Sequence, residues 1–128
     1  MKHFRLSKVK SNDTKPEKLV RKFLWDNSIR YRKNYKKWPG KPDIAFPGKK
    51  KVIFIHGCYW HRHKNCKFSY TPKSNQEFWE KKFVKNLERD IKNQKSLYEM
   101  QISFIIIWEC ELKNKSKWEK KVMDFVIN

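Results

Sequence analysis

The strongest indication of the fold lies in the segment Pro42-Asp43-Ile44-Ala45-Phe46-Pro47-Gly48-Lys49-Lys50-Lys51-Val52-Ile53-Phe54-Ile55-His56. Two short apolar runs, 42–46 and 51–56, flank a Pro47-Gly48 turn, and this pattern is typical of a β-hairpin. The second run is almost wholly apolar, so we predict a central strand buried on both faces of a sheet.

Three helices are predicted around the hairpin, each beginning at a box of residues with capping spacing. The boxes are Thr14-Lys15-Pro16-Glu17, Ser74-Asn75-Gln76-Glu77 and Ser116-Lys117-Trp118-Glu119. The first helix covers about 14–26, and the second extends to about Met100. The second helix is predicted to turn Phe78, Phe83, Leu87 and Ile91 toward the core.

The remaining segments complete a single domain over residues 1–128 with a basic arm at 1–12. Residues 102–108 read as a third buried strand, and 29–37 as a possible strand. The segment from Gly57 to Lys73 has no periodicity and gathers Cys, His, Trp and Tyr, so we expect a functional loop there. The order α-β-β-β-α-β-α predicts an α/β fold, a mixed β-sheet flanked by helices.

The charge of the chain indicates a polyanionic partner. Its 32 Lys and Arg against 13 Asp and Glu give a net charge of +19 among 128 residues. Nucleic acid fits such an excess best, although a Lys-rich surface arising from genomic base composition is the alternative. No apolar run reaches the roughly 18 residues of a membrane span, and the first residues lack a signal-peptide pattern. We therefore expect a soluble intracellular protein that does not contact a membrane.

Cysteine and histidine spacing predicts a structural zinc site. Cys58, His63 and Cys66 form a Cys-x4-His-x2-Cys pattern, and Cys110 follows 43 residues later. Three cysteines and one histidine make a closed tetrahedral zinc site without an open position for water. His61 or His56 are alternatives to His63, and three buried free thiols are the alternative to a metal.

A magnesium site is predicted at one edge of the sheet. The hairpin brings Asp43 and the Ile55–His56 region to the same edge. A carboxylate, a backbone carbonyl and imidazoles in one place suit Mg²⁺ and proton transfer beside a phosphodiester. The alternative is that Asp43 only caps a turn.

Several motifs resemble the very-short-patch-repair (Vsr) DNA mismatch endonucleases, in the right order over nearly the whole chain. The most specific motif is the block from Phe54 to His61. The matching segments are Ser7-Lys8-Val9 to Glu17, Gly40-Lys41-Pro42-Asp43, Phe54-Ile55-His56-Gly57-Cys58-Tyr59-Trp60-His61, Phe78-Trp79, Asn86-Leu87-Glu88-Arg89-Asp90 and Ile107-Trp108-Glu109-Cys110.

The resemblance implies a restriction-endonuclease-like fold and Mg²⁺-dependent nicking of one strand at T·G mismatches, which arise from deaminated 5-methylcytosine. It implies that Asp43 and the carbonyl of Ile55 bind Mg²⁺ and that His61 is the general acid/base. His56 and Glu17 match supporting catalytic groups, although helix capping alone also explains Glu17. The matching zinc ligands are Cys58, His63, Cys66 and Cys110.

The resemblance also implies residues that touch DNA. Tyr59 and Trp60 match aromatics that insert beside the mismatch, with burial in the core as the alternative. Leu6 stands where a methionine wedge is expected. The partner would be double-stranded DNA with a T·G mismatch, bound by a monomer in the bacterial cytoplasm at the nucleoid. Two other functions remain open: a restriction-type enzyme that cuts matched sites, and a non-catalytic zinc module that binds DNA.

Overall fold

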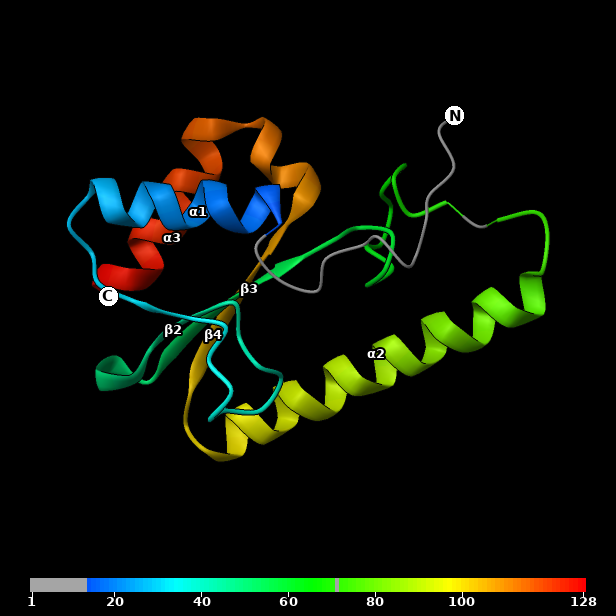
Figure 1. Cartoon of the computed structure of the whole chain (residues 1–128), viewed down its shortest axis with the longest axis horizontal. Coiled ribbons are helices and arrows are strands. Elements are labelled where there is room, and N and C mark those ends of the chain that lie inside the picture. The colour runs from blue at the N-terminus through cyan, green and yellow to red at the C-terminus, as the bar shows by residue number, and fades with distance from the viewer. Residues whose placement is uncertain (1–13, 71) are drawn as a thin grey trace.

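The computed structural model describes residues 14–70 and 72–128, which form a mixed four-stranded sheet with helices on both faces (Figure 1). The sheet order is β1-β2-β3-β4. The first three strands pair antiparallel, and β4 pairs parallel to β3. The elements are α1 (Lys15–Asp26), β1 (Arg32–Lys33), β2 (Ile44–Phe46), η2 (Pro47–Lys49), β3 (Lys51–His56), α2 (Gln76–Glu99), β4 (Ser103–Trp108), η3 (Glu109–Lys113) and α3 (Lys115–Ile127).

The predicted hairpin is confirmed. Strands β2 and β3 pair in the register Ile44↔Ile53, and a 3₁₀ turn with Lys50 in the left-handed region joins them. Successive side chains of a strand point to opposite faces of the sheet. Accordingly, Ile53 packs into one core while Val52 and Phe54 pack into another. The central strand is therefore buried on both faces, as its apolar sequence predicts.

The two cores lie on opposite faces of the sheet. The larger core joins the sheet to α1 and α3, which lie on one side of it in Figure 1. The smaller core joins the other face to the C-terminal end of α2, through Leu97. Each fully buried Leu or Ile contributes roughly 1.5–3 kcal/mol. The buried members of the larger core are Val20, Leu24, Ile44, Phe46, Ile53, Ile107, Trp118, Val122 and Val126.

Lysines of the hairpin hold the C-terminal end of α3. The Nζ of Lys51 donates to the Phe125 carbonyl at 2.7 Å, and the Nζ of Lys49 donates to the Val126 carbonyl at 3.0 Å. The last carbonyls of a helix have no partner within the helix, and cations there also interact favourably with the helix dipole. These bonds fix α3 against the sheet.

The outer strands differ from their predictions. Residues 102–108 were expected to be a buried strand, but β4 is an edge strand in which only Ile107 is buried. Of the segment 29–37, only the two exposed residues of β1 pair with the sheet. An apolar run indicates that a strand can form, but it does not indicate whether the strand pairs with a neighbouring strand on both of its edges.

One of the three predicted helix caps is confirmed. In α1, the Thr14 N–H donates to Glu17 Oε2 at 2.7 Å and Thr14 Oγ1 accepts from the Glu17 N–H. The cap of α2 is Asn75, whose left-handed backbone and lack of a side-chain bond rule out the expected box. The cap of α3 is Asn114, not Ser116, and its side chain accepts from the Lys117 N–H.

The predicted apolar side of α2 is wrong except for Phe83. Phe78, Leu87 and Ile91 are 51%, 39% and 63% exposed, whereas Phe83 and Leu97 are buried. Much of α2 extends beyond the sheet, alongside the loop that follows β3 (Figure 1). Its inward face is therefore set by that loop. Among the described residues, no helix is both long enough and apolar enough to cross a membrane.

Candidate active site and metal centre

A tight turn before β2 brings Asp43 to the end of the sheet at which β2 begins and β3 finishes. Gly40 has φ +83°, and a Cβ there would lie 3.1 Å from the ring of Phe54 and 3.2 Å from the Cβ of Asn93. Only glycine fits this close approach of the turn to β3 and α2. The turn leaves the Asp43 carboxylate facing β3, where its Oδ2 accepts the Ile55 N–H at 2.6 Å.

Asp43 lies beside a second buried carboxyl group, that of Glu17, which is 3% exposed. The pKa of Asp43 is raised to about 8, chiefly by burial and also by a hydrogen bond and charge repulsion with Glu17, while the Ile55 N–H opposes the shift. A divalent cation would reverse this balance, because it favours the ionised form of both groups. The pair therefore fits a cation better than it fits an apolar interior.

A histidine pair and a third carboxylate lie on the neighbouring part of the site. The Nδ1 of His61 is 2.6 Å from Oδ2 of Asp90, which comes from α2. The ring of His56 stacks on the ring of His61, with centroids 3.7 Å apart and planes at 8°. The pKa of His56 is lowered to about 3, chiefly by burial and also by the charge of His61, with Asp90 opposing. His56 is therefore neutral at physiological pH.

These groups open into one cavity of about 1250 Å³. Within residues 14–70 and 72–128, the Lys and Arg residues that line it are Lys41 and Arg89, against the four carboxylates of Glu17, Asp43, Asp90 and Glu109. Although the chain carries a net charge of +19, this cavity is locally acidic, which favours metal ions over a bare phosphate group. Among the described residues that line it are Glu17, Asp43, Ile55, His56, Tyr59, Trp60, His61, Asp90 and Glu109.

The four predicted zinc ligands meet outside this cavity. One ligand atom from each of Cys58, His63, Cys66 and Cys110 lies within 4.8 Å of the other three. His63 is thus the histidine that joins the cysteines, whereas His56 and His61 group with Asp90. Three sulfurs and one imidazole nitrogen at this spacing fit a tetrahedral zinc ion. The Cys/His cluster is a candidate metal site.

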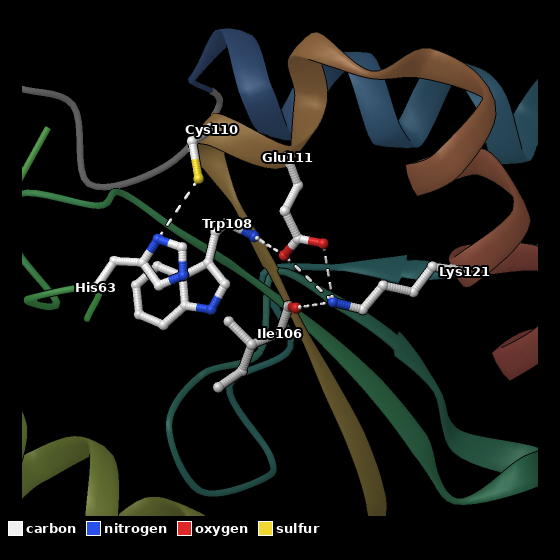
Figure 2. A network of polar contacts seen from close by, with 6 residues as sticks. All are labelled: His63, Ile106, Trp108, Cys110, Glu111 and Lys121. Carbon is white, nitrogen blue, oxygen red and sulfur yellow. Dashed lines mark hydrogen bonds and ion pairs between the residues drawn. The ribbon is translucent and has the colours of Figure 1, made fainter. Parts of the chain in front are cut away.

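Packing and polar contacts fix the Cys110 side of the cluster (Figure 2). The ring of Trp108 stacks on His63 at 4.1 Å, and the Nδ1 of His63 is 3.4 Å from Sγ of Cys110. Glu111 Oε1 accepts the Trp108 N–H, and Lys121 Nζ bonds both Glu111 oxygens and the Ile106 carbonyl, the latter at 2.8 Å. This network holds η3 against β4 and α3.

Tyr59 and Trp60 lie half-buried at the cavity wall. Their rings are 4.9 Å apart, and Tyr59 also lies 5.3 Å from the ring of Phe83 on α2. The ring of Trp60 lies 5.9 Å from that of Trp79. Both are therefore supported by α2 without being removed from solvent. Leu6, the third residue expected to touch DNA, lies outside the described residues.

Asp90 and Asn86 are site residues to which the sequence analysis gave no role. Asn86 donates to the Trp60 carbonyl at 3.1 Å, and Asp90 holds His61. Both lie on the face of α2 that carries the buried Phe83 and Leu97, at helical spacings of three, four and seven residues. Polar residues that share one stripe of a helix with apolar residues were the sequence signal that could have identified Asn86 and Asp90 as site residues.

Carboxylates and imidazoles around a cavity in a strongly basic chain are the groups that suit a nuclease, and carboxylates in such a site suit a divalent metal ion. Comparison with known proteins identifies the family. The profile of DNA mismatch endonuclease Vsr matches residues 1–67. The chain is 52% identical over 113 residues, 88% of its length, to the type II nicking enzyme V.NmeAIP of Neisseria meningitidis, of which it covers 80%.

Two further relatives agree. The type II nicking enzyme V.XorIIP of Xanthomonas oryzae is 34% identical over 98% of this chain and 91% of its own length. DNA mismatch endonuclease Vsr of Escherichia coli is 35% identical over 85% of this chain and 69% of its own length. The chain belongs to the Vsr DNA mismatch endonuclease family, and it is a DNA endonuclease.

Proposed function

We propose that this endonuclease nicks one strand of duplex DNA at a T·G mismatch, in a reaction that depends on Mg²⁺. The observation that carries the proposal is the shared cavity, in which Asp43, the His61–Asp90 pair and the aromatic residues Tyr59 and Trp60 line one space. The names of the relatives, a mismatch endonuclease and nicking enzymes, support the same activity.

We assign magnesium to the Asp43 carboxylate and the Ile55 carbonyl. The N–H of Ile55 points to Asp43, and the N–H and C=O of one strand residue point to the same side in an antiparallel pair. Both oxygens therefore face one spot, and Mg²⁺ prefers oxygen ligands. Magnesium bound there supplies positive charge to the phosphate that is cleaved. Glu17 adds negative charge that favours cation binding.

His61 is the proposed general base. Its Nδ1 must carry the proton that it donates to Asp90, so Nε2 is left free to take a proton from the attacking water. His56 supports this role by stacking on the ring of His61. Asp90 fixes the tautomer and stabilises the positive charge that His61 gains on accepting the proton.

The Cys58, His63, Cys66 and Cys110 cluster is proposed to hold a structural Zn²⁺. Four protein donors leave no position for water, so the ion has no part in hydrolysis. Zinc would join the loop after β3 to the end of β4. His61 and Tyr59 lie in the same loop segment as Cys58 and His63, and their positions would depend on this link.

Tyr59 and Trp60, with Leu6 of the basic arm 1–12, are the proposed DNA wedge. Inserting apolar side chains between base pairs costs a few kcal/mol, and a mismatch lowers that cost. Binding of this kind favours T·G over paired DNA. We further propose that residues 1–128 act as one domain with a restriction-endonuclease-like core, and that a monomer in the bacterial cytoplasm makes the single-strand cut.

A strand-resolved nicking assay tests the proposal, with T·G and matched duplexes that differ in one base. In Mg²⁺, wild type should nick one strand of the T·G duplex faster than the matched duplex, and Asp43→Ala should be inactive. Asp124→Ala, which removes an exposed carboxylate on α3, is the control that should retain activity. Equal rates on the two duplexes would refute mismatch preference, and cleavage of both strands of the matched duplex would favour a restriction-type enzyme.

A further inference from the structure

Arg62 lies between His61, the proposed base, and His63, a proposed zinc ligand. Its backbone has φ +52°, a left-handed conformation that is uncommon for a residue with a side chain. The loop therefore holds Arg62 in a costly conformation, which indicates that its side chain makes contacts that compensate for the strain.

The guanidinium group joins two limbs of the loop. Its Nη1 donates to the carbonyls of Tyr59 at 3.3 Å and Tyr70 at 3.0 Å, and its Nη2 donates to the carbonyl of Ser69 at 2.9 Å. Its Cζ lies over the ring of Phe83, 4.0 Å from the centroid. One side chain thus links the limb between Cys58 and His63, the limb that follows Cys66 and helix α2.

The proposed zinc ion and Arg62 act on different groups of the loop. The Cys/His cluster takes Cys66 from the second limb, where the Ser69 N–H donates to the Cys66 carbonyl at 3.0 Å, whereas Arg62 bonds the carbonyls of Ser69 and Tyr70. The rings of Tyr59 and Tyr70 lie 5.0 Å apart, and Arg62 Nη1 bonds the carbonyls of both residues. Arg62 thus bonds the backbone of Tyr59, and its Cζ also lies 5.6 Å from the centroid of the Tyr59 ring.

We propose that Arg62 is a positioning residue that sets the Tyr59 ring in the cavity and thereby determines how strongly the enzyme prefers T·G to paired DNA. The second part rests on the proposed function. The requirement is for a planar guanidinium: an ammonium group has no fork that reaches three carbonyls and cannot stack flat on an aromatic ring. Arg62→Lys should therefore behave like Arg62→Ala.

The test compares Arg62→Ala and Arg62→Lys with Lys64→Ala in the full chain. Lys64 is an exposed cation of the same loop, so its removal controls for loss of charge near DNA. A displacement of about 1 Å in a reacting or binding group can cost ~100-fold in rate. Both Arg62 variants should reduce the ratio of T·G to matched nicking rates by ~10-fold or more, with one bound zinc per chain as in wild type. Lys64→Ala should keep the wild-type ratio.

A fluorotyrosine placed at position 59 tests the positioning directly and without DNA. In wild type and Lys64→Ala, its ¹⁹F resonance should be narrow and its chemical shift should differ from that of free fluorotyrosine. In both Arg62 variants, the chemical shift should move toward that of the free amino acid. An unchanged resonance in Arg62→Ala, a wild-type nicking ratio in that variant or full rescue by lysine would overturn the proposal. If wild type shows no T·G preference, the proposed function fails, and the fluorine spectrum still decides whether Arg62 positions Tyr59.

Discussion

Replacing Asp43 by asparagine should abolish nicking and make the metal-free protein more stable. Asparagine keeps an oxygen that accepts the Ile55 N–H, and its amide can donate to Glu17. The substitution therefore retains the hydrogen bonds and removes a carboxyl group whose ionised form is disfavoured by burial and by a neighbouring carboxyl group. An active-site group that destabilises the empty site is expected where a cation belongs.

The size of the effect follows from the pKa of Asp43, which rises from 3.8 to about 8 on folding. Between these values the unfolded chain releases a proton that the folded chain keeps, so wild-type stability falls as the pH rises from about 4 to about 8. At about 1.4 kcal/mol per pKa unit, this loss reaches at most ~4 kcal/mol at neutral pH. The amide of the variant does not titrate, so Asp43→Asn should gain stability by up to that amount at neutral pH and by almost nothing at the lower end of this range.

Urea unfolding at several pH values, in zinc-replete buffer without magnesium, measures the difference. Adding Mg²⁺ should then stabilise wild type much more than Asp43→Asn, because the variant lacks the carboxylate that binds the cation and keeps only the charge of Glu17. Asp124→Asn, at an exposed carboxylate, controls for the change in net charge. A variant that is less stable than wild type at neutral pH, or a stability difference that does not vary with pH, would show that burial of the Asp43 carboxyl group does not destabilise the metal-free protein.

Three further results are expected. Asp90→Asn should lower the single-turnover nicking rate by ~100-fold or more while DNA affinity stays within a few fold, because His61 loses the carboxylate that fixes its tautomer; an equal loss of affinity would contradict this. Glu17→Gln keeps the capping box with Thr14, so its melting temperature should not change. Slower nicking by this variant at low Mg²⁺ would assign Glu17 to the metal site, whereas unchanged nicking would show that Glu17 acts only as a helix cap. Cys66→Ser should lose bound zinc, measured by metal analysis, and nick both T·G and matched duplexes poorly; a fully active zinc-free variant would exclude a structural role for the metal.

Local sequence patterns predicted the elements on which the site is built. The hairpin, the capping box of α1 and the helical character of α2 each depend on residues that are near neighbours in the chain, and the structure confirms them. The hairpin in turn brings Asp43 to Ile55, because its two strands pair antiparallel across a short turn. The Cys and His spacing likewise predicted the four residues that gather in the Cys/His cluster.

The pairing of distant side chains was not contained in those patterns. Spacing left three histidines as possible partners for the cysteines, and only the folded loop separates His63 from His56 and His61. Periodicity likewise predicted that the side of α2 with Leu87 and Ile91 faces the core. Both residues are exposed, because the loop after β3 covers the side with Asp90 instead.

Local sequence patterns were enough to predict a basic α/β fold with a carboxylate at the edge of a central hairpin, and a set of candidate metal ligands of which three lie in the following loop. The tertiary structure alone decided that β4 lies at the sheet edge, that Asp90 orients His61 and that Arg62 joins the limbs of the loop. The physical reason is the range of the interactions. Hydrogen bonds of turns and caps act between residues a few positions apart, whereas these contacts form only after sheet and helices have packed and brought distant segments together.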